Sequence, residues 1–218
     1  MRSTATTVAI IDEHDVVHAG IAAWCADADP EIEVIGSYRR PSDYLTDARA
    51  VEPDVVVLDL QFDSMRPDFD VVRQLGERGQ RVIVYSNMTA DEVILTCLDL
   101  GASTYLVKSE GKRHLIDAIH EADSASPYVA PRMGRALLND STLGRVKLSE
   151  REREVLVAWF QTESKDLVGR QLFIAPTTVR THLQRARAKY ALVGRPAPTK
   201  SALLARAIED GILGPGEL

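Results

Sequence analysis

Five short runs of β-branched and aliphatic residues alternate with longer stretches of helical spacing over roughly the first 120 residues of the chain. Near-continuous apolar runs of this kind are typical of parallel strands that are buried on both faces. Strands that alternate with helices predict a doubly wound α/β domain with a five-stranded parallel sheet. The expected strands cover residues 8–11, 32–35, 55–58, 82–85 and 104–107.

The charge of the chain changes sign along its length. Residues 1–140 carry 13 basic and 24 acidic side chains, a net charge of −11, whereas residues 141–218 carry 13 basic and 8 acidic ones, a net charge of +5. Opposite signs in a chain of 218 residues favour two domains. We expect an α/β domain over 1–122, a linker with a short helix over 123–146, and an all-helical domain over 147–218.

Other features of the composition exclude several classes of protein. The chain has no apolar run of about 18–20 residues, which a membrane-spanning helix would need. Two cysteines, Cys25 and Cys97, are too few for a disulfide framework and are expected to be reduced thiols in the core. We therefore expect a cytoplasmic protein without a membrane partner.

Charged and hydroxyl side chains stand where the predicted strands end. Asp12 and Glu13 follow the first strand, Asp59 the third, Ser86 the fourth and Lys108 the fifth. In a parallel doubly wound sheet these ends converge. Carboxylate oxygens suit Mg²⁺, and an aspartate beside that ion is able to accept a phosphoryl group. The hydroxyl and the ammonium would then hold phosphoryl oxygens.

These residues resemble the receiver domain of bacterial response regulators, over roughly residues 7–122. The matching segments are VAIIDEH from Val8, VVLDL from Val56, VYS from Val84 and GASTYLVK from Gly101. The resemblance implies that a sensor histidine kinase phosphorylates the chain and that Mg²⁺ takes part. The implied roles are Asp59 as phosphoacceptor, Asp12, Glu13 and Asp59 as metal ligands, Ser86 and Lys108 as phosphoryl contacts, and Tyr105 as the aromatic residue that switches orientation.

Two positions depart from the receiver pattern. Glu13 stands where Asp is usual, and the loop over residues 61–68 is about one residue longer than usual and lacks a Pro-Gly step. The alternative is therefore an atypical receiver that is regulated by a ligand, a partner or abundance. A phosphatase with Asp59 as nucleophile would usually carry a second acid two residues later, where this chain has Gln61. We therefore do not expect an enzyme.

The C-terminal part reads as four helices. Ser149 and Glu152 form the pattern of a capping box at the start of the first. Ser164 is expected to cap the second, over 164–172. The third runs over 176–190 from a proline, which the first turn tolerates, and Thr199 is expected to cap the last, over 200–210.

The third of these helices has one apolar and one polar side. Val179, Leu183, Ala186 and Tyr190 are spaced to form a buried stripe, and no acid occurs between Arg170 and Lys200. An acid-free helix with polar side chains outward is typical of insertion into the major groove of DNA. The candidate contact residues are Thr177, Arg180, Thr181, Gln184, Arg185 and Lys189.

This part of the chain resembles the LuxR-type helix-turn-helix domain of NarL/FixJ-type response regulators, over about residues 147–213. The resemblance implies that 176–190 is the recognition helix for double-stranded DNA and that the last helix pairs two domains. We expect a homodimer at least in the active state, with RNA polymerase as a further candidate partner. The loop over 194–198 is about three residues longer than usual. A protein-docking module without a DNA role is the rival hypothesis.

The opposite charges of the two parts suggest one further hypothesis. The acidic receiver could transiently cover the basic helix until activation. A net charge of −6 for the whole chain therefore does not argue against DNA binding.

Overall fold

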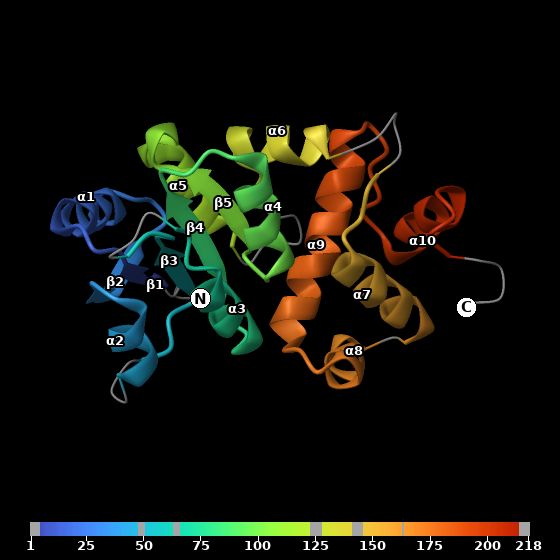
Figure 1. The fold of residues 1–218 in the computed structure, drawn as a ribbon, viewed down its shortest axis with the longest axis horizontal. Helices are drawn as coiled ribbons and strands as arrows, with labels where there is room; N and C mark the ends of the chain where they lie inside the picture. Colours follow the sequence, from blue (N-terminus) through green and yellow to red (C-terminus); the bar gives the residue numbers. More distant parts are fainter. Residues whose placement is uncertain are drawn as a thin grey trace.

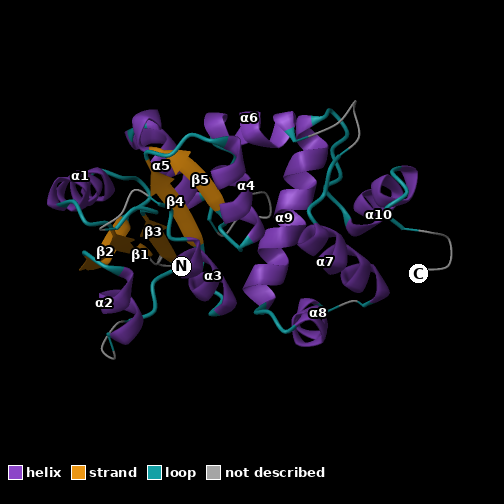
Figure 2. Ribbon diagram, viewed as in Figure 1, coloured by secondary structure: helices purple, strands orange, loops and turns teal. Residues whose placement is uncertain are grey.

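The computed structural model describes residues 5–47, 51–62, 66–122, 128–140, 146–162 and 164–213. In these ranges an α/β domain is followed by a helical domain (Figures 1 and 2). No helix in the described ranges is long and apolar enough to cross a membrane.

The sheet has five parallel strands in the order β2-β1-β3-β4-β5, which confirms the predicted fold class. The strand order reverses between β1 and β3, and in open α/β sheets ligands bind at such a switch point. The observed bounds are β1 Thr6–Ile11, β2 Ile32–Tyr38, β3 Val55–Leu58, β4 Val82–Ser86 and β5 Thr104–Val107. Strands β3, β4 and β5 are buried along their whole length, as their apolar sequences require.

Helices and one 3₁₀ turn surround the sheet. Helix α1 contacts α5, and α3 contacts α4, so that the strands lie in a single core with them. The bounds are α1 Asp15–Ala26, α2 Pro41–Thr46, α3 Phe69–Glu77, α4 Asp91–Asp99, η1 Lys108–Glu110 and α5 Lys112–His120.

A short helix, α6 (Pro131–Asn139), stands in the predicted linker and is attached to the α/β domain. The Arg132 guanidinium donates to the backbone carbonyl of Thr89 and to Asp91, and Asn139 Nδ2 donates to the same carboxylate at 2.8 Å. In addition, the Thr104 hydroxyl of β5 donates to the backbone just before α6. Helix α6 is thereby held against α4 and β5 rather than projecting as a free spacer.

The helical domain contains α7 (Glu150–Gln161), α8 (Lys165–Leu172), α9 (Pro176–Leu192) and α10 (Lys200–Glu209). The capping box of α7 is confirmed: Ser149 N donates to Glu152 Oε2 at 2.9 Å, and Glu152 N donates to Ser149 Oγ at 3.3 Å. Thr199 caps α10, also as predicted. The prediction for Ser164 is wrong, because its side chain accepts no hydrogen bond from α8; Asp166 in the first turn faces the positive end of that helix instead.

The predicted apolar stripe of α9 forms the core of the helical domain. Val179, Leu183, Ala186 and Tyr190 are all at most 1% exposed and pack with residues of α7 and α8. Helix α9 is also the element that faces the α/β domain (Figure 1). Thr178 Oγ1 donates to the carbonyl oxygen of Gly76, at the end of α3, across 2.6 Å, so that the two domains are in direct contact.

A buried ion pair joins α7 to α9. Lys189 Nζ lies 2.9 Å from Glu152 Oε2, and the two side chains are 5% and 1% exposed. The same ammonium donates to the backbone carbonyl of Lys147. Glu152 therefore both caps α7 and balances a buried cation.

We predict that Glu152→Ala lowers the free energy of unfolding of the helical domain by about 3–5 kcal/mol, because it removes the carboxylate that balances the buried Lys189 ammonium and leaves it with the Lys147 carbonyl alone. Urea unfolding followed by Trp159 fluorescence in a Trp24→Phe background measures the change. Glu154→Ala is the matched control on the same helix: its carboxylate pairs with Arg151 at the surface, and the expected loss is about 0.5 kcal/mol or less. Equal losses for both variants would contradict the prediction.

Candidate functional site

The chemistry-bearing residues predicted at the strand ends do converge at one edge of the sheet. Asp12 follows β1 and Asp59 follows β3, and the Asp59 N–H donates to the carbonyl of Ile11 at 2.9 Å. Ser86 is the last residue of β4, and Lys108 follows β5 directly. The parallel register of the strands is what brings these residues together.

An ion triad occupies the centre of this edge. Lys108 Nζ donates to Asp12 Oδ2 and to Asp59 Oδ2, both at 2.7 Å. The two carboxylates are each 3% exposed and the lysine side chain is 12% exposed. Burial lowers the pKa of Lys108, but the hydrogen bonds and charges of the two aspartates outweigh it, so that its pKa lies above the ordinary value.

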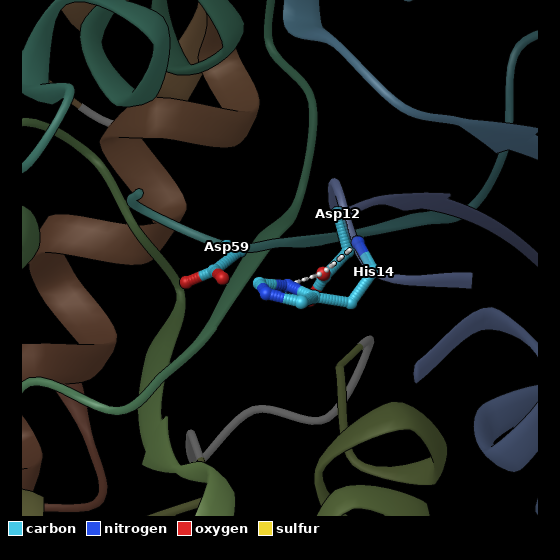
Figure 3. Close-up of side chains that lie close together, drawn as sticks. All are labelled: Asp12, His14 and Asp59. Carbon is cyan, nitrogen blue, oxygen red and sulfur yellow. Dashed lines mark hydrogen bonds and ion pairs between the residues drawn. The ribbon is translucent and has the colours of Figure 1, made fainter. Parts of the chain in front are cut away.

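His14 also lies at this site, and the sequence analysis did not single it out. Its backbone N–H donates to Asp12 Oδ1 at 2.8 Å, and its Nδ1 lies 2.9 Å from the same oxygen (Figure 3). Asp12, His14 and Asp59 offer ligand atoms within 4.8 Å of one another. Glu13 is not part of this group, and its side chain is 36% exposed. The sequence gives one indication of the role of His14, which is that it directly follows the acidic pair Asp12-Glu13.

The donor set fits a hard divalent cation. Asp12 and Asp59 place carboxylate oxygens close together in a buried site with a single lysine to balance them, and Mg²⁺ prefers such oxygen ligands. The Nδ1 atom of His14 is already bonded to Asp12. We therefore regard the two aspartates as the residues that would hold Mg²⁺.

Ser86 and Tyr105 lie beside the triad on the next two strands. Both side chains are fully buried. The Tyr105 hydroxyl donates to the carbonyl of Met88 in the β4–α4 loop at 2.9 Å. Burial raises the pKa of Tyr105, and the nearby Ser86 hydroxyl opposes this rise only in part. Tyr105 therefore remains a neutral hydrogen-bond donor that points from the site toward α4.

The predicted DNA-contacting residues of α9 are for the most part covered. Thr177 and Arg180 keep some exposure, but Thr181, Gln184, Arg185 and Lys189 are buried. The expectation that these four side chains point outward is wrong for this arrangement. The reason is that the α/β domain lies against this side of α9, and that Lys189 pairs with Glu152.

The Arg185 side chain is completely buried and makes few hydrogen bonds. Its Nη2 donates to His182 Nδ1 at 2.8 Å, while its Nε and Nη1 lack hydrogen bonds within the described residues. Burial lowers the pKa of Arg185, although Glu152 and Asp99 of α4 lie close enough to oppose this. Burial and the charge of Arg185 together lower the pKa of His182 to about 2, so that this imidazole is neutral and accepts.

Two family models match the chain, and their order agrees with the two domains. Residues 8–120 match the response regulator receiver domain, and residues 146–197 match the luxR family of bacterial regulatory proteins. The first match covers more than half of the chain. The chain belongs to the response regulators. It is of the NarL/FixJ type, and its two domains make it a DNA-binding regulator of transcription.

Full-length relatives share this organisation. The response regulator is 29% identical to the transcriptional regulatory protein LiaR of Bacillus subtilis, over 81% of this chain and 86% of LiaR. It is 28% identical to the nitrate/nitrite response regulator protein NarL of Escherichia coli K12, over 87% of this chain and 91% of NarL. Among solved structures, the Salmonella typhimurium RcsB response regulator matches with a TM-score of 0.57 at 16% identity, over 94% of this chain and 99% of that one, which shows the same fold.

We predict that Lys108→Gln lowers the free energy of unfolding of this response regulator by about 3 kcal/mol at neutral pH, because it leaves two buried carboxylates without their cation. The pKa of Lys108 is higher in the folded state than the value of about 10.4 for an unfolded lysine. The contribution of Lys108 to the free energy of unfolding is therefore fully present below the unfolded-state pKa, and it is lost as the pH rises through the folded-state pKa. Added Mg²⁺ should restore part of the loss.

Urea unfolding at pH 7, with and without Mg²⁺, measures this effect. Lys112→Gln is the matched control, because it removes an exposed pair with Asp27 at 3.2 Å that is worth about 0–1 kcal/mol. A Lys108→Gln protein as stable as the control would show that the triad does not stabilise the fold.

Proposed function

We propose that Asp59 is the phosphoacceptor of this response regulator and that its phosphorylation releases α9 to bind double-stranded DNA. The observation that carries the proposal is that the Asp12–Lys108–Asp59 triad and the covered helix α9 occur in one chain, whose receiver contacts α9 directly. The proposed domains cover 1–122 and 147–218, with the linker and its helix α6 over 123–146.

The triad can perform phosphoryl transfer from a sensor histidine kinase. A carboxylate oxygen of Asp59 forms the new bond to phosphorus while the bond from phosphorus to the donor breaks. Lys108 and Ser86 then hold oxygens of the transferred group. Mg²⁺, held by Asp12 and Asp59 and in our proposal also by Glu13, would neutralise part of the charge on that group.

A chain of contacts leads from the site to α9. Tyr105 is bonded to the carbonyl of Met88, and the adjacent carbonyl of Thr89 accepts from Arg132 of α6. Helix α6 in turn contacts α9. A shift of Ser86 and Tyr105 toward a phosphoryl group would therefore alter how α6 and α4 support α9. Such a switch works through two arrangements that differ in their affinity for DNA.

In the present arrangement four of the six candidate DNA contacts are buried, Lys189 by its pair with Glu152 within the helical domain. DNA contacts by the other three would require the domains to separate. We propose that the released protein binds DNA as a homodimer, with RNA polymerase as a further partner of the bound form. Structures of RcsB, which has the same fold, include RcsB dimers bound to DNA. Paired half-sites would then lie about one helical turn, or a multiple of it, apart.

We predict that phosphoramidate with Mg²⁺ adds the mass of one phosphoryl group to the wild-type chain and raises its affinity for DNA. Asp59→Asn should show neither change, whereas Asp15→Asn, at an exposed position on α1, should behave as wild type. Intact-mass spectrometry and fluorescence anisotropy on labelled duplex DNA measure the two effects. No mass increase, with equal DNA affinity for Asp59→Asn and wild type, would favour the atypical receiver instead.

We predict that Thr178→Val raises the DNA affinity of the unphosphorylated protein by about twofold to tenfold. The variant removes the hydrogen bond from Thr178 to Gly76, which exists only when the domains are in contact and contributes about 0.5–1.5 kcal/mol, while the Gly76 carbonyl keeps its bond from Gly79 N. Thr96→Val, which removes a hydroxyl that bonds within α4, is the control and should leave the affinity unchanged.

The salt dependence of the same anisotropy titration distinguishes a DNA-binding domain from a protein-docking module. An affinity that falls steeply with salt, and falls again in Arg180→Ala, supports phosphate contacts by α9. An affinity that is independent of salt and of Arg180 would favour a protein-docking module.

A further inference from the structure

A half-open pocket of about 370 Å³ lies at the C-terminal end of α9. Ala188, Ala191 and Leu192 of α9 form one wall, Val129 before α6 forms another, and residues 196–198 close the third side. These walls are apolar, and the volume falls in the range of roughly 300–1,000 Å³ that is typical of small-molecule sites. The third wall comes from the loop that is longer than usual for a LuxR-type domain.

One cation, Arg187, lines this apolar pocket. Its guanidinium carbon lies 5.4 Å from the centre of the Trp159 ring, and its Nε is buried without a hydrogen bond. In the described ranges of the chain no carboxylate pairs with it, and burial alone lowers its pKa. A half-buried cation without an anion costs free energy that an anionic ligand would recover.

Further positive charge surrounds Arg187. Lys200 Nζ lies 5.2 Å from the same Trp159 ring. The pKa of Lys165 is lowered by burial and by the charges of Arg180 and Arg187. Arg187 therefore has other cations near it, which favours an anion, while the apolar walls favour a hydrocarbon tail.

We propose that this pocket binds a small carboxylate with an apolar tail, and that the bound molecule holds the two domains together. The carboxylate would pair with Arg187, and the tail would contact Ala191, Leu192 and Val129. An inorganic anion or a DNA phosphate alone would leave those apolar walls in water.

Both sides of the inter-domain contact contribute to the pocket. Val129 follows Tyr128, whose carbonyl accepts a hydrogen bond from Thr104 of β5, so that this wall is fixed to the α/β domain. The other two walls belong to the helical domain. A ligand that touches both binds the closed arrangement more tightly than the open one, and so shifts the population away from DNA binding.

The probe is decanoate. Decanol tests the apolar tail without the carboxylate, and acetate tests the carboxylate without the tail. We titrate each into the full chain carrying Trp24→Phe, in which Trp159 is the remaining tryptophan. Decanoate is expected to change the Trp159 emission saturably with one site per chain. Decanol and acetate should each bind about tenfold more weakly or worse, since a hydrogen bond to a charged group contributes about 1.5–3 kcal/mol.

Two pairs of variants locate the site. Arg187→Gln should reduce decanoate to the affinity of decanol, whereas Arg153→Gln, at an exposed position on α7, should leave it unchanged. Ala191→Phe should fill the pocket and abolish binding, whereas Ala191→Ser should retain it. Decanoate binding that equals decanol binding in the wild type, or that survives Arg187→Gln or Ala191→Phe, would overturn the proposal.

The second part of the proposal, that the ligand holds the domains together, is tested by measuring the affinity for DNA. Decanoate should lower the affinity of the wild type for duplex DNA and should have no effect on Arg187→Gln; an equal response of both would overturn the coupling to domain closure. The fluorescence titration contains no DNA and no phosphodonor, so its result does not depend on the function proposed for Asp59 or α9.

Discussion

Helix α9 is packed on two sides, and the two contacts differ in kind. On one side Val179, Leu183 and Tyr190 are buried among the apolar residues of α7 and α8, a contact that the hydrophobic effect makes permanent. On the other side the α/β domain covers threonine, glutamine and arginine side chains. Arg185 is desolvated there without a bonded carboxylate, so that this second contact gains little free energy from its charge. The helical domain can therefore stay folded while its contact with the receiver is broken.

The proposed phosphorylation site contains a similar imbalance of charge. Two buried carboxylates share one ammonium, so that the triad carries a net negative charge in a site with little water. A divalent cation would reverse that sign, and phosphorylation of Asp59, which replaces one negative charge by about two, would bring the sum close to zero. Tyr105 is bonded to the β4–α4 loop beside this site, and the same loop is bonded to α6. The site and the proposed switch are therefore joined by direct contacts.

Much of this architecture could be predicted from the sequence, because it follows from periodic burial. Strands β3 and β5 have the predicted bounds, and the convergence of Asp12, Asp59 and Lys108 follows from a parallel sheet alone. The capping box of Ser149 is a local signal and was equally readable. The strands and the capping box are each encoded in one stretch of chain, and the convergence needs only the rule that parallel strands end at the same edge of the sheet.

The inter-domain contact was not predictable in the same way. Thr178, His182, Arg185 and Lys189 recur with helical spacing, but a polar stripe reads equally well as a surface that faces water or DNA. Thr178 bonds Gly76, about a hundred positions earlier in the chain, and Lys189 pairs with Glu152 of α7; no local pattern in α9 reveals either partner. His14 was missed for a different reason: its role depends on a bond to Asp12, which residue type alone does not reveal.

Two contacts of the receiver with α9 involve the main chain of the receiver. Thr178 bonds a backbone carbonyl, that of Gly76, and Gly79, at φ +79°, leaves room where a Cβ would lie 2.7 Å from the Thr177 hydroxyl. A carbonyl group is the same in every residue, so most substitutions of receiver side chains leave this bond intact. Receiver side chains can thus change while this bond is kept, provided that glycines stay at positions 76 and 79, because a Cβ at Gly76 would lie 2.9 Å from the Leu100 carbonyl oxygen. In evolutionary terms, this contact between the domains and the rest of the receiver surface are free to change separately.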